Sequence, residues 1–306
     1  MDHSVNRKGF LRQSAVLLAA LSVGSSFESN ASKKRLAFST LGCPDWDFES
    51  ILTFAQKNQY EGLEIRGLQK QLDLSKVPEF ATTAARKISL QKMKDHGLRF
   101  VNLGSSCTLH FPEGSERIKQ LDEGKRFIDI ARDLNCPFIR VFPNNFPKEQ
   151  EKEFTMDLMA KGMNDLAAHA KGSNVDILIE THGDLVKADH IVSVMNRVEK
   201  KGTGIIWDVA NMWTITKESP SSVYPKLSPF IKHTHIKDAF FDKGKWNYVL
   251  LGKGEVPIFE AIDLLAKDRY KGYYSFEWEK LWHPEIEAPE IALADFPIAM
   301  SKHQTK

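Results

Sequence analysis

The sequence of 306 residues is poor in cysteine, in long apolar runs and in charge of one sign. Its three cysteines lie far apart, so they form no paired metal motif and no disulfide framework. Lysine and arginine together number 42 against 40 for aspartate and glutamate, which leaves a formal net charge of +2. This balance gives no electrostatic reason to expect a nucleic-acid or membrane-surface partner. We therefore expect buried free thiols and no nucleic-acid partner.

An apolar stretch stands near the N-terminus, at residues 15–23, and it follows three basic residues, Arg7, Lys8 and Arg12. Small residues come next, and Ser29 and Ala31 are spaced as at a signal-peptidase cleavage site. The stretch is too short to cross a bilayer comfortably as a permanent anchor. This order of basic, apolar and small residues predicts an export signal, and the alternative is a buried N-terminal helix.

We expect the signal to cover residues 1–31 and the folded domain to cover residues 32–306. The signal is similar to a twin-arginine type in which Lys8 replaces the second arginine, so the export route stays open. The mature protein is then expected in the periplasm, without stable membrane insertion once the signal is removed.

Short apolar runs alternate with amphipathic stretches along the rest of the chain. Strands are expected at residues 35–41, 62–66, 100–103, 138–142, 176–180, 204–208, 231–236 and 272–277. Helices are expected at residues 48–58, 80–96, 116–135, 149–171, 188–198, 221–227, 258–267 and 289–300. Apolar runs without strict alternation are typical of parallel strands that are buried on both faces.

Eight such strand–helix units in about 270 residues match the usual size of a closed barrel. The sequence therefore predicts one α/β domain, a single (β/α)8 TIM barrel, and a doubly wound open sheet is the alternative. No linker rich in proline, glycine or serine divides the chain. Residues 240–255 are longer than a simple connection and are expected to form an ordered flap over the mouth of the barrel.

Side chains that can bind a metal stand at or near the ends of the last four predicted strands. They form a four-residue cluster of Glu180, Asp208, His235 and Glu277. In a barrel of this kind the functional groups lie at the carboxyl ends of the strands. Successive members are about one strand–helix unit apart, and only the interval before Glu277 is longer, because it contains the flap. These side chains can therefore converge at the mouth.

Three carboxylates and one imidazole suit a divalent cation such as Mn²⁺, Mg²⁺, Co²⁺ or Zn²⁺. The lack of a thiolate favours the harder ions. Any single member would more often be an ion-pair partner, a helix cap or a hydrogen-bonded structural histidine. The joint pattern on four successive strand ends is what predicts a metal site.

Further polar residues near strand ends are candidates for substrate contacts, namely His182, Lys237, Arg66 and Arg140. For His182 the alternative is a hydrogen bond behind the site. For the two arginines it is buried ion pairing with Glu64 or another neighbour. His233 stands two residues before His235, and we expect it to face the helix layer as a structural residue.

Motifs around the cluster point to a known family. They are residues 179–184 (IETHGD), 207–211 (WDVAN), 233–238 (HTHIKD), 251–257 (LGKGEVP) and 275–280 (SFEWEK). Together they resemble the xylose isomerase-like TIM barrel superfamily, also called the sugar phosphate isomerase/epimerase family, over about residues 35–300. The segment at residues 278–285 is similar to an exported bacterial subgroup of that family.

The resemblance implies that the four-residue cluster binds a divalent metal and that Glu180 and Glu277 exchange a proton with the substrate. Two departures from the ketose 3-epimerases in this family limit what else can be transferred. Asn211 stands where those epimerases often carry a histidine, and Lys237 and Asp238 stand where an arginine is usual. Asn211 is kept as a candidate substrate contact, but the substrate contacts of the epimerases are not carried over.

The chemistry common to the family is removal of a proton next to a carbonyl through a metal-stabilised enediolate. We expect an isomerase or epimerase that acts on a keto sugar or sugar derivative. A lyase or dehydratase that cleaves 3-keto glycosides or keto polyols by β-elimination is the alternative, and a non-catalytic sugar-binding barrel is a second one. The expected partner is a small-molecule carbohydrate, with self-association into a homo-oligomer left open.

Overall fold

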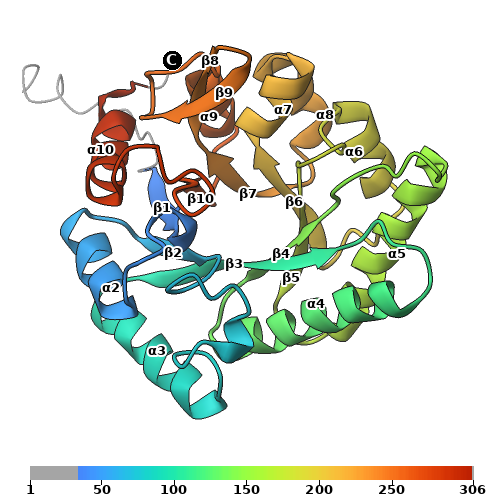
Figure 1. Ribbon diagram of the computed structural model, residues 1–306, viewed down its shortest axis with the longest axis horizontal. Coiled ribbons are helices and arrows are strands. Elements are labelled where there is room, and N and C mark those ends of the chain that lie inside the picture. Colours follow the sequence, from blue (N-terminus) through green and yellow to red (C-terminus); the bar gives the residue numbers. More distant parts are fainter. Residues whose placement is uncertain (1–33, 305–306) are drawn as a thin grey trace, which may run out of the picture. The chain divides into compact units, whose positions relative to one another are not determined.

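Eight parallel strands close into a barrel in the computed structural model, which describes residues 34–304 (Figure 1). The strands are β1 (Arg35–Ser39), β2 (Gly62–Ile65), β3 (Arg99–Thr108), β4 (Phe138–Phe142), β5 (Asp176–Glu180), β6 (Thr203–Asp208), β7 (Ile231–Ile236) and β10 (Tyr273–Phe276). Their order around the barrel is β1-β10-β7-β6-β5-β4-β3-β2. The predicted (β/α)8 barrel is thus confirmed. The open sheet is wrong, because β1 pairs with β10 and closes the ring.

Helices surround the strands on the outside (Figure 1). They are α2 (Phe48–Lys57), α3 (Thr83–Asp95), α4 (Ser115–Asp133), α5 (Lys152–His169), α6 (Ala188–Met195), α7 (Val209–Thr216), α8 (Pro220–Leu227), α9 (Ile258–Lys267) and α10 (Pro289–Lys302). Two short 3-10 turns, η1 (Thr40–Gly42) and η2 (Leu74–Lys76), lie in the connections after β1 and β2. The helices predicted from the sequence are all present, with ends shifted by a few residues.

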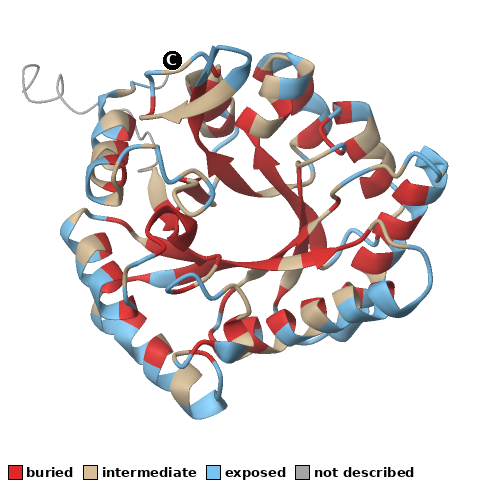
Figure 2. Ribbon diagram, in the orientation of Figure 1, coloured by how far each residue is buried: buried red, intermediate tan, exposed pale blue. Residues whose placement is uncertain are grey.

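The strands are buried on both faces, as their composition predicts. In β5, Ile177, Leu178 and Ile179 are each at most 1% exposed, because one face meets the barrel interior and the other meets the helices. Figure 2 shows the barrel strands coloured mostly as buried, whereas the helices are buried on their inner faces and exposed on their outer ones. The core therefore has two layers, one inside the barrel and one between the barrel and its helices.

The last helix packs over the point where the barrel closes. Phe296 on α10 stacks on Phe276 of β10 with ring centroids 4.6 Å apart, and it also stacks on Tyr60 at 6.4 Å. The hydroxyl of Tyr60 donates a hydrogen bond of 2.6 Å to the backbone oxygen of Leu293 on the same helix. These contacts join the first strand–helix unit to the last helix.

Two features of the chain were not predicted. Helix α7 begins directly at the end of β6, because the Asp208 side chain accepts a 2.8 Å hydrogen bond from the backbone N–H of Asn211 and caps the helix. Strand β3 runs to Thr108 rather than ending near residue 103, and its pairing with β4 is irregular between Gly104 and Thr108. Both features lie at the carboxyl ends of barrel strands, α7 after β6 and the added residues at the end of β3.

The predicted flap is an antiparallel hairpin of β8 (Asp238–Asp242) and β9 (Lys245–Val249), which follows β7 directly (Figure 1). The buried carboxylate of Asp238 holds it in place. This carboxylate accepts hydrogen bonds from the backbone N–H groups of Ala239, Gly252, Gly254 and Val256. A side chain at position 254 would collide with this carboxylate, so the close approach requires glycine there. One side chain thus fixes both the start of the hairpin and the loop that follows it.

The predicted export signal at residues 1–31 lies outside the described residues, so the signal and the boundary at residue 32 stay predictions. Within residues 34–304, no helix is both long enough and apolar enough to pass through a membrane. The expected burial of the three cysteines is confirmed, since Cys43, Cys107 and Cys136 are all free and buried.

Replacing Phe296 by alanine should lower the free energy of unfolding by about 3–5 kcal/mol, because it removes a fully buried ring from the stack on Phe276. Ile298→Ala on the same helix is the matched control, because Ile298 is 49% exposed and its truncation should change stability little. Urea denaturation followed by circular dichroism measures both changes. Equal effects of the two substitutions would contradict the proposed role of α10.

Candidate metal centre

The structure brings the four-residue cluster together at the carboxyl ends of the barrel strands. Glu180 and Asp208 are the last residues of β5 and β6, His235 is the next-to-last residue of β7, and Glu277 directly follows β10. One ligand atom from each residue lies within 4.8 Å of the corresponding atom of every other. All four side chains are buried, with at most 3% of each residue exposed.

The convergence follows from the strand order and register. Strands β5, β6, β7 and β10 are consecutive around the barrel. Asp208 lies beside His235 in the pairing of β6 with β7, and Ser275, two residues before Glu277, lies beside His235 in the pairing of β7 with β10. Four neighbouring strands therefore deliver their final polar side chains to one point.

His235 stands at the centre of this arrangement. Its Nδ1 atom lies 3.2 Å from a Glu277 oxygen, 3.4 Å from a Glu180 oxygen and 3.8 Å from Asp208 Oδ2. Nevertheless, among the described residues Nδ1 makes no hydrogen bond of acceptable geometry, and Asp208 Oδ2 makes none either, although it forms an ion pair with Lys237. Buried polar atoms are rarely left without a hydrogen-bond partner. Donor atoms that converge on one point without bonding each other are suited to share a cation, so the cluster fits a metal ion.

Glu64, which the sequence indicated only as a possible ion-pair partner of Arg66 and Arg140, fixes the orientation of His235. It lies on β2 with no exposed surface, and its carboxylate is 3.0 Å from Nε2 of His235 and 2.9 Å from Nε2 of His233. A carboxylate on the far nitrogen of a histidine sets the ring so that its other nitrogen faces a metal. The signal in the sequence was an acidic residue within an otherwise apolar strand, but nothing local indicated its partner.

The predicted orientation of His233 is wrong. Residues two apart on a strand point to the same face, so His233 and His235 both project into the barrel interior. His233 is 1% exposed and contacts Glu64 from below the four-residue cluster rather than facing the helices. The ring supports Glu64, which agrees with a structural role.

Charge around His235 decides its protonation in the absence of a metal. Burial by itself would lower the pKa of His235, but the carboxylates of Glu277, Glu64 and Glu180 outweigh burial and raise this pKa well above its usual value. Burial lowers the pKa of His233, against the opposing effect of Glu64. His235 is therefore the protonated member of the pair, and a metal that binds at Nδ1 must displace a proton.

Two buried cations lie against the carboxylates of the cluster. Arg140 is 3.1 Å from Glu180 and 3.6 Å from Glu277, while the Lys237 ammonium is 2.8 Å from Asp208 and 2.7 Å from Glu277. Lys237 also contacts Glu279 at 2.5 Å. Arg140 and Lys237 are each 1% exposed, so these pairs are well shielded from solvent. Both cations hold the carboxylates in fixed positions.

These neighbours keep the two glutamates ionised. Burial acts to raise the pKa of Glu277, but His235 and Lys237 outweigh it and hold this pKa well below its usual value. Burial and the charge of Glu277 act to raise the pKa of Glu180, but Arg140 and His235 outweigh them and lower it. Both carboxylates are therefore available at neutral pH as proton acceptors or as metal ligands.

Of the other residues predicted to contact a substrate, Asn211 contacts the four-residue cluster, whereas His182 and Arg66 make their contacts elsewhere. Asn211 lies at the cluster, since its side-chain amide donates a 3.3 Å hydrogen bond to Glu180. His182 packs against Phe142 with ring centroids 4.8 Å apart, and its Nδ1 is buried without a hydrogen-bond partner among the described residues. Arg66 donates to the backbone oxygen of Gly104 and to the Ser106 hydroxyl, and it makes no ion pair with Glu64 among the described residues.

Glu279 is a second residue at the site whose role was not predicted from the sequence. Its carboxylate is within 3.8 Å of His283 as well as touching Lys237, and its side chain is 15% exposed. It therefore lies between the buried cluster and the surface of the mouth. Its position two residues after Glu277 was the only feature of the local sequence that could have indicated a place near the cluster.

Glu64→Gln should weaken metal binding by about 10- to 100-fold, because the amide no longer provides a charged acceptor for His235 Nε2. Titration calorimetry with Mn²⁺ measures the affinity, and thermal unfolding checks that the fold persists. Glu116→Gln, on the exposed first turn of α4, is the control and should bind Mn²⁺ as the native chain does. Unchanged affinity in Glu64→Gln would remove Glu64 from the site.

The comparisons with known proteins agree with this fold. The sequence matches the family described as xylose isomerase-like TIM barrel over residues 52–295. No curated protein matches it in sequence. Solved structures share the fold at low identity.

The probable 3-DHS dehydratase AsbF from Bacillus anthracis superposes with a TM-score of 0.70 at 17% identity, over 88% of this chain and all of that one. The D-psicose 3-epimerase from Clostridium cellulolyticum H10 gives 0.69 at 14% identity, over 87% and 97%. The IolI protein, with a zinc atom, gives 0.71 at 15% identity, over 87% and 96%. Because the family match covers well over half of its length, the chain belongs to the xylose isomerase-like TIM barrel family.

Proposed function

We propose that the protein is a metal-dependent isomerase or epimerase of a keto sugar or sugar derivative. The observation that carries the proposal is the convergence of three buried carboxylates on the Nδ1 atom of His235 without hydrogen bonds. The epimerase named among the similar structures supports the reaction class, and the low identity leaves the substrate open.

Negative charge exceeds positive charge around the cluster, which supports a cation there. Three cations, namely Arg140, Lys237 and the His235 imidazolium of the metal-free protein, face five carboxylates: Glu64, Glu180, Asp208, Glu277 and Glu279. Buried charges are costly unless they are compensated. A divalent ion would supply the missing positive charge, and oxygen-rich ligation suits Mn²⁺ or Mg²⁺, with Co²⁺ and Zn²⁺ also accepted by such a set. Zinc is the metal named for IolI.

A divalent ion held by the four-residue cluster would supply Lewis-acid stabilisation of negative charge on the substrate oxygens next to the reacting carbon. Glu180 and Glu277 approach from β5 and β10, so a sugar bound between them would present its two faces to two carboxylates. Because both are held ionised, either one can accept the proton. Return of that proton to the other face of the same carbon gives epimerisation, and return to the neighbouring carbon gives isomerisation.

The neighbouring residues would position these carboxylates and the sugar. Arg140 contacts both glutamates and would keep their separation constant. Lys237 donates to Glu277 and would stabilise the charged form that accepts the proton. His182, whose Nδ1 has no hydrogen-bond partner in the described part of the chain, and Asn211, whose amide donates to Glu180, are the proposed contacts to sugar hydroxyls. Arg66 is a proposed contact from the opposite wall, next to Ser106.

A lyase or dehydratase is the second candidate. Removal of the proton by a single ionised carboxylate is sufficient to start a β-elimination, and both glutamates are in that state. The dehydratase named among the similar structures supports this reading. The two candidates separate in D₂O, because proton NMR reports deuterium at one sugar carbon for epimerisation and loss of a group for elimination.

Dialysis against a chelator should abolish activity, and Mn²⁺ should restore it. Because His235 is protonated in the metal-free protein, each ion that binds should release a proton, and affinity should fall as the pH is lowered. Titration calorimetry in two buffers of different ionisation enthalpy measures that release. His235→Asn should lose it, whereas His169→Asn on the surface of α5 should keep it. A protein that binds no divalent metal would contradict both candidates.

Glu277→Gln should reduce the exchange of the substrate proton with D₂O by about 100- to 10,000-fold, because the amide cannot accept a proton. Glu279→Gln is the matched control, since Glu279 contacts Lys237 but lies outside the four-residue cluster. Thermal unfolding and metal content are measured for both variants. Near-native exchange in Glu277→Gln, with metal bound, would exclude the proposed role.

A further inference from the structure

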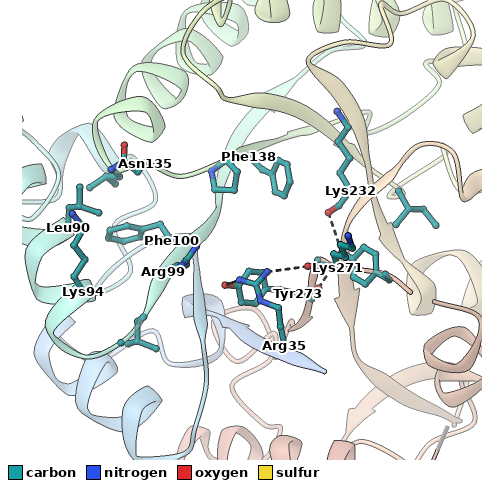
Figure 3. A pocket seen from close by; sticks show the side chains of 17 residues that line it. Arg35, Leu90, Lys94, Arg99, Phe100, Asn135, Phe138, Lys232, Lys271 and Tyr273 are labelled. Carbon is teal, nitrogen blue, oxygen red and sulfur yellow. Dashed lines mark hydrogen bonds between the residues drawn. The ribbon is translucent and has the colours of Figure 1, made fainter. Parts of the chain in front are cut away.

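A large cavity lies at the end of the barrel opposite to the four-residue cluster. It has a volume of about 920 Å³, within the range of small-molecule sites. Its walls come from the first residues of the barrel strands, among them Arg35 of β1, Arg99 of β3, Phe138 of β4 and Tyr273 of β10 (Figure 3). On β7 it is lined by Lys232, three residues before His235, which corresponds to a separation of about 10 Å along the strand. The cavity and the cluster are thus different sites.

The charge of this cavity is one-sided. Among the described residues, its lining includes five cationic side chains, Arg35, Lys94, Arg99, Lys232 and Lys271, and no aspartate or glutamate. In the whole sequence the two signs are nearly equal in number. A concave surface lined by one sign focuses the electrostatic potential and attracts ions of the other sign. The cavity therefore favours an anion.

Only two of the five cations have a protein counterion among the described residues. Lys232 pairs with Asp176 at 2.7 Å, and Arg35 is 3.7 Å from Glu61. The other three, Lys94, Arg99 and Lys271, make no ion pair or side-chain hydrogen bond with the described part of the chain. Three positive charges at one cavity are thus available to a ligand.

The floor of the cavity is apolar. Its accessible apolar side chains are Leu90, Phe138 and Ile231, which are half-buried, whereas Leu98, Phe100 and Leu134 are at most 3% exposed. The phenol ring of Tyr273 lies under the guanidinium of Arg35, with 4.0 Å between the guanidinium carbon and the ring centroid. Figure 3 shows these rings between the charged side chains. An inorganic anion would satisfy the cations but would leave this floor uncovered.

We propose that this cavity binds a small organic anion with more than one negative charge on an apolar, ring-sized body. The anionic groups would contact Lys94, Arg99 and Lys271, and the apolar body would cover Leu90, Phe138 and Ile231. The site is independent of the metal centre, so the proposal goes beyond the proposed function and does not depend on it.

The test uses the disulfonated dye bis-ANS, which combines two anionic groups with an apolar aromatic body. Fluorescence titration of the full chain should give saturable binding of one dye per chain. Lys94→Ala/Arg99→Ala should raise the Kd by about tenfold, since two of the three available charges are removed. Lys271→Glu should also raise it, and added NaCl should weaken binding to the native chain.

The matched control is Lys87→Ala/Lys92→Ala, which also removes two charges, both outside the cavity and on α3, the helix that carries Lys94. It should leave the Kd unchanged, and so should Glu277→Gln, because the metal centre lies at the other end of the barrel. Circular dichroism confirms that each variant is folded. No saturable binding to the native chain, an unchanged Kd in Lys94→Ala/Arg99→Ala, or an equal loss in the control would overturn the proposal.

Discussion

Glu64 and His235 lie on β2 and β7, which are not neighbours in the barrel, and their hydrogen bond crosses the barrel interior. This contact determines which nitrogen of His235 faces the three carboxylates. His235 Nε2 contacts both oxygens of Glu64, and one of these oxygens also contacts His233 and accepts a 3.3 Å hydrogen bond from the Ser275 hydroxyl, so the carboxylate is fully engaged in a buried region. A histidine free to rotate in this position would present its metal-binding atom only part of the time.

The sequence predicted the part of the site that depends only on the order of the strands along the chain. The last polar residues of four successive strands were enough to predict that Glu180, Asp208, His235 and Glu277 converge, because parallel strands of a barrel end at the same side. Glu64 was not predicted, because its partners are about 170 residues away and no local pattern indicates them. Helix α7 was missed because Asp208 both ends a strand and caps a helix, and propensity does not reveal such a double role.

The contacts of Arg140 and Lys237 also needed coordinates. Each is a basic residue in an apolar strand or at its end, and from sequence a substrate contact and a buried ion pair are equally plausible. The structure places both among the carboxylates of the cluster, where they offset part of its negative charge. At the other end of the barrel the cations have few such partners among the described residues. One end of the barrel therefore has an excess of negative charge, and the other has an excess of positive charge.

Asp238 has a consequence for how the segment between β7 and α9 can move. Its carboxylate binds backbone N–H groups at the start of the hairpin and in the loop at residues 252–256, so both ends of the segment are tied to one point. The hairpin cannot peel away one strand at a time without breaking these bonds. Residues 238–256 are thus held as one unit, and any displacement of the hairpin would carry the loop at residues 252–256 with it.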